Sequence, residues 1–236
     1  MRLNDPALVR SEYADETGLA QRSAAQQLST GQDPRQLAFE AVAEVEPRRV
    51  LEVGPGRGEL AERIAREVGA EVTAVDQSPR MVELTRGRGV EAIVGDVEDL
   101  PFAAGQFDCA LAAWMLYHVP DLDRGLRELR RVLRPHGRLV AVTNSERTLH
   151  ELWSLLGDDW TPSDGFSAES GEWPLLRHFT IVERRDVRGT VTFPDREAAR
   201  RYVAASPTRA HLADRLPSFD GPLIASRYVV VFVCTP

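Results

Sequence analysis

Residues 50–61 read VLEVGPGRGELA and carry the pattern that decides the fold. The apolar run Arg49–Val53 predicts a buried strand, and the 3.6-residue spacing of apolar side chains in Glu59–Val68 predicts a helix. Between them, glycine takes three alternate positions, namely Gly54, Gly56 and Gly58. Glycine permits positive φ and close approach of a ligand, and free N–H groups at a helix N-terminus attract anions. The stretch therefore predicts a ligand-binding turn between a strand and a helix.

Strands and helices continue to alternate on both sides of this turn. Further strands are predicted at Glu71–Val75, Val90–Val94, Phe107–Ala113, Arg138–Thr143, Phe179–Val191 and Arg227–Cys234. Further helices are predicted around Leu19–Leu28 and at Pro34–Glu44, Pro79–Arg86, Leu122–Leu133, Arg147–Leu156 and Asp195–Ala205. Such alternation builds an α/β fold, a parallel sheet with helices on both faces. Ligands of these sheets bind beyond the carboxyl ends of the strands, so we expect the site just after Val53, Val75, Val94 and Ala113.

The length of 236 residues favours one domain with additions. We expect a core over residues 48–145, an N-terminal helical cap over 1–47, and lid insertions at 146–176 and 195–222. The chain has no apolar run of the ~20 residues that span a membrane, and it starts without the apolar stretch of a signal peptide. We therefore expect a cytoplasmic protein, and we leave monomer and homodimer open.

The charged residues exclude several chemistries. All 29 Lys and Arg positions are arginine, which rules out Schiff bases, pyridoxal phosphate anchoring and the P-loop lysine. A net charge of −7 weighs against a nucleic-acid partner. The two cysteines, Cys109 and Cys234, lie far apart in apolar runs, so they predict buried thiols and no metal site.

Two acidic residues follow predicted strands at the same edge of the sheet. Asp76 ends the second strand, where a carboxylate suits the hydroxyls of a ribose. Capping of the next helix is the alternative, but Ser78 already stands before Pro79 for that purpose. Asp96 follows the third strand, where a carboxylate can accept a hydrogen bond from the exocyclic amine of adenine.

Five ordered segments support a resemblance to a known family. They are LEVGPGRGELA, VDQSPRMVEL, GDVEDLPF, FDCALAAWMLYHVPD and LRELRRVLRPHGRLVAVTNS. Together they resemble the class I S-adenosylmethionine-dependent methyltransferases, closest to the methyltransferase type 11 group, over about residues 48–145. The resemblance implies a Rossmann-like three-layer αβα sandwich with seven strands, the last of them antiparallel. A helical stretch between the sixth and seventh strands departs from the family pattern and adds lid material.

The resemblance also implies S-adenosyl-L-methionine as cofactor and S-adenosyl-L-homocysteine as product. Glu52 would hold the methionine ammonium, and the backbone of Gly54, Gly56 and Gly58 would form the bed beneath the methionyl part. Ala113, with Ala112 before it, would pass close to the sulfonium.

At the nucleoside end, the resemblance assigns the ribose hydroxyls to Asp76, with Gln77 beside it. Asp96 would receive the adenine amine, and the backbone N–H of Val97 would reach a ring nitrogen. Met81 would pack on an adenine face, or else serve as an ordinary helix-core methionine.

Candidates for a general base are His118, His150 and Tyr13, each with a structural alternative. His118 follows the fourth strand, where a structural or cofactor-side role is favoured. His150 would lie on the helix after the fifth strand, and Tyr13 could close over the methionine end. Aromatic residues in or beside the lid suit a mostly apolar small acceptor, although ordinary packing is the alternative for each; they are Trp114, Trp153, Trp160, Phe166 and Trp173.

We expect methyl transfer to O, N or C of a small molecule. The alternatives are methylation of a tRNA or protein, and an S-adenosylmethionine-binding protein that transfers no methyl group. A nicotinamide dehydrogenase is disfavoured, because the turn reads GxGxG instead of GxGxxG and a tyrosine–lysine pair is missing.

Overall fold

The computed structural model describes residues 3–13, 28–157 and 165–236. The helix expected around Leu19–Leu28 lies almost wholly outside the described residues, as does Trp160.

The centre of the molecule is a seven-stranded sheet in the order β3-β2-β1-β4-β5-β7-β6. Its strands are β1 (Arg49–Val53), β2 (Glu71–Asp76), β3 (Glu91–Val94), β4 (Phe107–Ala113), β5 (Leu133–Asn144), β6 (Ile181–Phe193) and β7 (Leu223–Thr235). Strands β1 to β5 pair in parallel, whereas β7 runs antiparallel to both β5 and β6. The expected seven-stranded, mainly parallel sheet with an antiparallel last strand is therefore confirmed.

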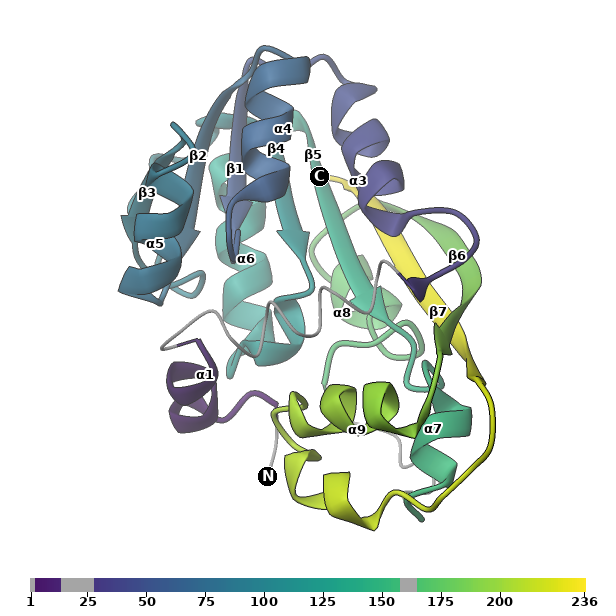
Figure 1. Ribbon diagram of the computed structural model, residues 1–236. Helices are drawn as coiled ribbons and strands as arrows, with labels where there is room; N and C mark the ends of the chain where they lie inside the picture. Colours follow the sequence, from purple (N-terminus) through teal and green to yellow (C-terminus); the bar gives the residue numbers. More distant parts are fainter. Residues whose placement is uncertain (1–2, 14–27, 158–164) are drawn as a thin grey trace.

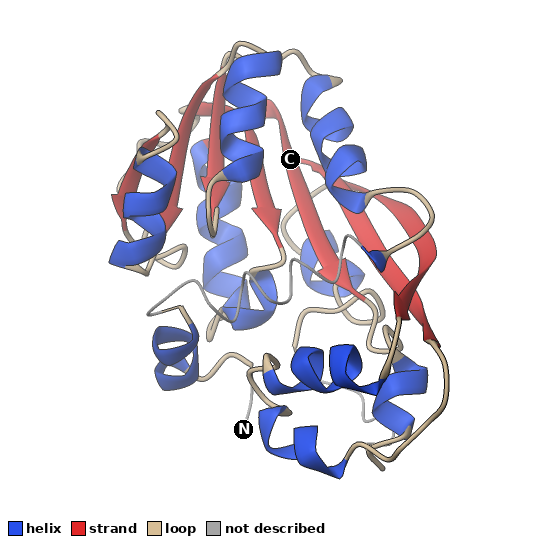
Figure 2. Cartoon of the chain, viewed as in Figure 1, coloured by secondary structure: helices blue, strands red, loops and turns tan. Residues whose placement is uncertain are grey.

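Helices cover both faces of the sheet (Figures 1 and 2). On one face pack α3 (Pro34–Ala43), α4 (Glu59–Glu67) and α5 (Pro79–Arg86), and they share with the sheet a core that includes Val50, Leu111 and Val231. On the other face pack α6 (Leu122–Val132) and α8 (Glu172–Leu176). The alternation of strand and helix in the sequence thus produces the three expected layers.

A separate helical lid stands beyond the carboxyl edge of the sheet. It contains α7 (His150–Ser154), α9 (Arg196–Ala204) and a 3₁₀-helix, Ala210–Arg215. These helices pack with the distal ends of β6 and β7 around their own buried cluster, which includes Leu152, Phe193 and Val203. In Figure 1, the arrows of β1, β2 and β4 point toward the end of the molecule where α1 (Pro6–Glu12) and the lid lie.

The expected helix Arg147–Leu156 is wrong at its start, because α7 begins only at His150. The preceding residues form a turn that is held by Glu169. The Glu169 carboxylate accepts hydrogen bonds from the Ser145 hydroxyl and from the Glu146 N–H, at 2.5 and 3.0 Å. This partner lies more than 20 residues away in sequence, so local spacing carries no sign of it.

Candidate functional site

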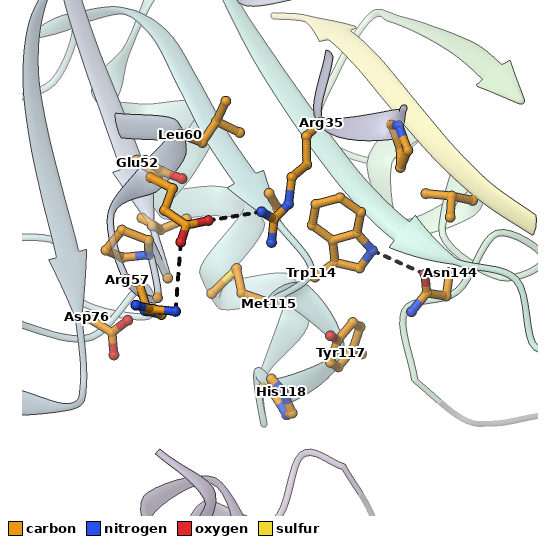
Figure 3. Close-up of a pocket in the computed structure, with 18 of the residues that line it drawn as sticks. Arg35, Glu52, Arg57, Leu60, Asp76, Trp114, Met115, Tyr117, His118 and Asn144 are labelled. Carbon is orange, nitrogen blue, oxygen red and sulfur yellow. Dashed lines mark hydrogen bonds and ion pairs between the residues drawn. The ribbon is translucent and has the colours of Figure 1, made fainter. Parts of the chain in front are cut away.

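A cavity of about 480 Å³ opens at the carboxyl ends of β1, β2 and β4. Its first half is formed by the glycine turn and its neighbours, among them Glu52, Gly54, Gly56, Asp76, Gln77, Val97 and Ala113. Its second half reaches the lid and includes Asn144, Thr148, Leu149, Val191, Tyr202 and Arg227. In Figure 3, Asp76 and Asn144 lie on opposite sides, with Arg35 and Trp114 between them.

The three glycines of the turn serve different purposes. Gly54 and Gly56 line the cavity with φ of 64° and 57°. A Cβ on Gly54 would come within 2.7 Å of the Met115 Cβ, so glycine is needed for this approach as well as for the positive φ. Gly58 is buried at the start of α4, where a Cβ would stand 2.9 Å from the backbone of Thr85. Gly58 therefore lets α4 and α5 pack closely and does not line the cavity.

Glu52 is a buried carboxyl group that faces the cavity from β1. Its side chain is 2% exposed, and no described residue hydrogen-bonds its Oε2. Burial raises its pKa to about 8; the positive charge of Arg35 opposes this rise and the charge of Asp76 adds to it. An unpartnered buried oxygen of this kind costs free energy unless a donor arrives, so the position suits a cationic ligand group.

Asp76 also lines the cavity, at the end of β2. Its Oδ1 accepts a hydrogen bond from the Ser78 N–H at 2.9 Å. Burial raises its pKa to about 6, against the effect of backbone N–H groups at Ser78, Gly56 and Gln77. The Ser78 hydroxyl in turn receives the Met81 N–H at the start of α5, so Ser78 and not Asp76 caps this helix.

Two residues expected at the nucleoside end do not line the cavity. Met81 is fully buried in α5. The Oδ1 of Asp96 accepts a hydrogen bond from the Glu98 N–H at 2.9 Å, within the turn after β3. By contrast, the buried Val97 and the exposed Gln77 both border the cavity.

His118 and Tyr13 meet at the edge of the cavity, although 105 positions separate them in sequence. The Nδ1 of His118 lies 2.8 Å from the Leu3 carbonyl, which can only accept, so Nδ1 carries the proton. Nε2 then accepts from the Tyr13 hydroxyl at 3.0 Å. The Ser78 hydroxyl donates to the Tyr13 carbonyl at 2.7 Å. Both ring nitrogens of His118 are therefore engaged in holding α1 against the core.

His150, the third candidate for a general base, lies apart from these residues. Its side chain is exposed on α7, and it does not line the cavity. The Ser154 hydroxyl stands 3.4 Å from its Nδ1. The structure thus brings Tyr13 and His118 together and leaves His150 outside.

Trp114 divides the two halves of the cavity. Its φ of 55° is rare for a bulky residue, and its indole N–H donates to the Asn144 Oδ1 at 3.1 Å (Figure 3). The Arg35 guanidinium lies 5.9 Å from the centre of the indole ring. The sequence pointed to Trp114 only as an aromatic, because its pairing with Asn144 depends on the contact between β4 and β5.

Of the aromatic residues that we expected around the acceptor and that the structure describes, only Trp114 lines the cavity. Trp173 is 77% exposed on α8, and Phe166 is buried in the core between the sheet and α6. Trp153 packs in the lid, with its ring centre 6.2 Å from that of Tyr202. Ordinary packing, the alternative for each of these residues, accounts for Phe166 and Trp153.

Four arginines that sequence reasoning did not single out also line the cavity, namely Arg35, Arg57, Arg63 and Arg227. Glu59 accepts ion pairs from Arg35 at 3.0 Å and from Arg57 at 3.9 Å. The position of Arg57 between two glycines of the turn was a usable signal. Arg35 and Arg227 arrive from distant elements, and nothing in their local sequence marks them.

Metal and membrane features are absent from the part of the chain that the structure describes. Within it, no three side chains among His, Cys, Asp and Glu gather as metal ligands. Of the described helices, none has the length and apolar character needed to cross a membrane.

Comparisons with known proteins agree with this fold. The family described as "Methyltransferase domain" matches residues 51–141. A demethylmenaquinone methyltransferase of Thermotoga maritima is 34% identical over 162 residues, which cover 65% of this chain and 70% of that protein. A malonyl-[acyl-carrier protein] O-methyltransferase of Halorhodospira halophila is 33% identical over 157 residues, covering 63% of this chain and 50% of that protein.

Among solved structures, the YcgJ protein of Bacillus subtilis superposes with a TM-score of 0.62 at 18% identity, covering 85% of this chain and 97% of that one. This likeness shows the shared fold. The matched residues 51–141 include the last three residues of β1, the glycine turn and most of the first half of the cavity. The order of the strands, the glycine turn and the similarity to known methyltransferases together show that the chain belongs to the class I S-adenosylmethionine-dependent methyltransferases.

Proposed function

We propose that this chain transfers the methyl group of S-adenosyl-L-methionine to O, N or C of a small molecule bound between the sheet and the lid. The observation that carries the proposal is the cavity itself. It runs without interruption from the glycine turn to residues of the lid. Its second half combines apolar side chains such as Leu149 and Val191 with polar groups such as Asn144 and Thr148, and the polar groups could fix the orientation of a small molecule.

The first half of the cavity fits the cofactor. The unpartnered Oε2 of Glu52 suits the methionine ammonium, and Gly54 and Gly56 leave their backbone open beneath the methionyl part. The carboxylate of Asp76 is held by backbone N–H groups at the cavity wall, where it suits the ribose hydroxyls.

For the adenine end, we propose that Val97 offers its backbone N–H and Gln77 lies beside the ribose. Because the Oδ1 of Asp96 already accepts from Glu98, the adenine amine would be received by the other oxygen of Asp96. Met81 supports this end from the interior of α5.

The bound cofactor supplies a sulfonium methyl group that is already an activated electrophile. The protein then has to hold the acceptor atom in line at ~3–3.5 Å from that carbon. It also has to exclude water from the reacting atoms. Ala113 and Trp114, at the end of β4, border the point where the two halves of the cavity meet. We assign positioning roles to Tyr13 and His118, because their hydrogen bonds hold α1 over the cavity.

Binding of the cofactor is tested by calorimetry with S-adenosylmethionine, S-adenosylhomocysteine and NAD(H). We expect binding in the micromolar range for the first two and none for NAD(H); preferential binding of NAD(H) would overturn the proposal. Asp76→Ala should weaken binding by ~1–3 kcal/mol through loss of hydrogen bonds. Asp220→Ala, which removes an exposed acid of the lid region, is the matched control.

Transfer is tested with cofactor labelled on its methyl group. The names of two relatives suggest the first acceptors, namely demethylmenaquinone and the malonyl group of malonyl-[acyl-carrier protein]; tRNA and protein side chains are included as rivals. We expect label in a small molecule. Label in tRNA or protein, or tight cofactor binding with no transfer to any acceptor, would contradict this proposal and favour the corresponding alternative.

A further inference from the structure

Arg227 is a buried arginine in the lid half of the cavity. It lies on β7, is 8% exposed, and lines the cavity. Its Nη2 donates to the carbonyls of Thr30 and Gln32, at 2.9 and 2.8 Å. Its Nε has no hydrogen-bond partner among the described residues. A buried donor without an acceptor marks a place where a ligand oxygen would be stabilised.

The charge of Arg227 is also uncompensated, unlike that of the neighbouring cations. Arg35 pairs with Glu59 at 3.0 Å, and Arg63 pairs with Glu67 at 3.1 Å. No acidic side chain in the described residues comes within ion-pair distance of Arg227. Asp33 contributes only a longer-range attraction, and burial lowers the pKa of Arg227. A buried cation without a counter-charge is unfavourable, and a bound anion relieves that cost.

The surroundings of Arg227 are shaped to hold its guanidinium in this place. Gly189 is its partner on β6, and a Cβ there would come within 3.1 Å of the Arg227 Nη2 and 2.1 Å of the Thr30 carbonyl. Glycine at this position therefore leaves the room that the guanidinium and residues 30–32 occupy. The two backbone carbonyls hold the Nη2 group of the planar guanidinium, while its Nε–H keeps donor capacity.

Register within the sheet separates Arg227 from the reacting end of the cavity. Ala113, Val142 and Val231 share one row across β4, β5 and β7. Arg227 lies four residues beyond Val231, which is roughly 13 Å along the strand at ~3.3 Å per residue. A group bound by Arg227 is thus far from the end of β4, where the acceptor atom would lie.

From these contacts, and resting on the proposed methyl transfer, we infer that the acceptor is an elongated small molecule with an oxyanion, a carboxylate or a phosphate, at the end distant from the methylated atom, and that Arg227 binds this group. The methyl group is transferred at the opposite end, beside Trp114. The oxyanion is not modified. It determines which acceptors are bound with the atom to be methylated next to the methyl group of the cofactor.

The test uses the full chain saturated with S-adenosylhomocysteine and three probes of similar shape: benzoate, benzamide and phenylphosphonate. Calorimetry should show benzoate binding at least tenfold more tightly than benzamide, because only benzoate carries the charge. Tighter binding of phenylphosphonate than of benzoate would identify a phosphate, and the reverse order a carboxylate. Equal binding of benzoate and benzamide to the wild-type protein would overturn the inference without any variant.

Arg227→Gln should abolish the preference for benzoate while leaving the affinity for S-adenosylhomocysteine within twofold. Arg188→Gln, which removes an exposed charge from the neighbouring β6, should keep the preference. A preference that survives in a folded Arg227→Gln protein would place the anion elsewhere and overturn the assignment. If Arg227→Gln fails to fold, Arg227→Lys takes its place in the test. This variant retains the charge and should keep part of the preference for benzoate.

The outcome separates this inference from the proposed function. A protein that binds no S-adenosylhomocysteine contradicts both. A protein that binds S-adenosylhomocysteine but shows no preference for oxyanion probes contradicts the role of Arg227 and leaves methyl transfer standing.

Discussion

Glu52 is a residue at which stability and ligand binding make opposite demands. Burial raises the pKa of its carboxyl group to about 8, from an ordinary value of 4.5. The folded protein therefore holds this proton more tightly than the unfolded chain does. Protonation stabilises the fold at low pH, and this contribution is lost as the pH rises from about 4.5 through 8. A cationic ligand group binds the ionised carboxylate, which burial disfavours in the ligand-free protein.

Glu52→Gln should accordingly remove this pH dependence. At pH 8, we expect the variant to exceed the wild-type protein in free energy of unfolding by on the order of a few kcal/mol. Near pH 4.5, the two proteins should differ little. Urea denaturation across this pH range measures the effect, with Glu71→Gln, an exposed glutamate at the start of β2, as control. Parallel pH profiles for wild type and Glu52→Gln would contradict the raised pKa.

The same substitution should weaken the binding of S-adenosylmethionine at least tenfold, because a neutral amide cannot pair with the ammonium. In the wild-type protein, binding should release protons near pH 7, and affinity should rise with pH until about 8. Calorimetry in buffers of different ionisation enthalpy detects the released protons. Unchanged affinity in Glu52→Gln would exclude Glu52 as the ammonium partner.

Gly54 can be compared with a second glycine of the same backbone conformation. Gly54 and Gly105 have φ of 64° and 66°, but a Cβ meets Met115 at 2.7 Å in the first case and nothing within 4 Å in the second. Gly105→Ala should cost about 1–2 kcal/mol of stability from backbone strain. Gly54→Ala should cost about 1–3 kcal/mol more, from overpacking. Thermal denaturation measures both losses of stability. Equal losses in the two variants would show that Met115 can move aside without destabilising the protein.

Among the elements, α1 depends on its contacts with the core. It has 7 residues, fewer than an isolated helix needs for stability in water. Asp5 caps its first turn, since the Asp5 Oδ1 accepts from the Ala7 N–H at 2.9 Å. Its last turn ends at Tyr13, which bonds to His118 and Ser78. The side chain of His118 therefore joins an N-terminal element to the loop after β4.

His118→Ala should release α1 without unfolding the sheet. We expect amide hydrogen exchange at Val9 and Tyr13 to accelerate at least tenfold, because two hydrogen bonds worth about 0.5–1.5 kcal/mol each are lost. Exchange in β1 and β4 should not change. His150→Ala, on the exposed face of α7, is the control and should leave α1 protected. If His118 were a general base with no part in anchoring, kcat would fall while exchange of α1 stayed as in the wild type.

In the whole molecule, the sheet and the lid have separate cores. The sheet is buried on both faces by its helices, whereas the lid cluster gathers α7, α9 and the distal ends of β6 and β7. The cavity lies where the two bodies meet, so the half that we propose for the cofactor is lined by the edge of the sheet and the half that we propose for the acceptor extends to the lid. Such a division allows the lid to open locally while the sheet stays folded.

Two buried leucines test this division. Leu152 lies in the lid cluster and Leu139 in the sheet core, and both are fully buried. Leu139→Ala should lower the global free energy of unfolding by about 2–5 kcal/mol. Leu152→Ala should accelerate hydrogen exchange mainly in α9, while affinity for S-adenosylhomocysteine stays within twofold. Equal loss of protection in β1 and α9 for Leu152→Ala would show that sheet and lid unfold as one unit.

How much the sequence predicts differs along the chain. β1, α5 and β4 begin and end at the predicted residues, because apolar runs bounded by glycine or proline mark them. By contrast, α8 was not predicted at all, and β7 begins at Leu223, four residues before its predicted start. That end of β7 pairs with β6 out to Phe193, a long-range contact that local pattern does not contain.

The half of the cavity that we propose for the cofactor could be predicted from short, contiguous motifs. Glycine dihedrals, helix starts and strand ends depend on neighbouring residues, so Glu52, Gly54 and Asp76 were recognisable as a group before folding was considered. The half that we propose for the acceptor could not be predicted in this way. Asn144 and Arg227 belong to segments about 80 residues apart, and the residues 30–32 that hold Arg227 lie nearly 200 positions away. Their meeting depends on the antiparallel pairing of β7 with β5 and β6, because packing between distant segments, unlike a turn, has no local signature.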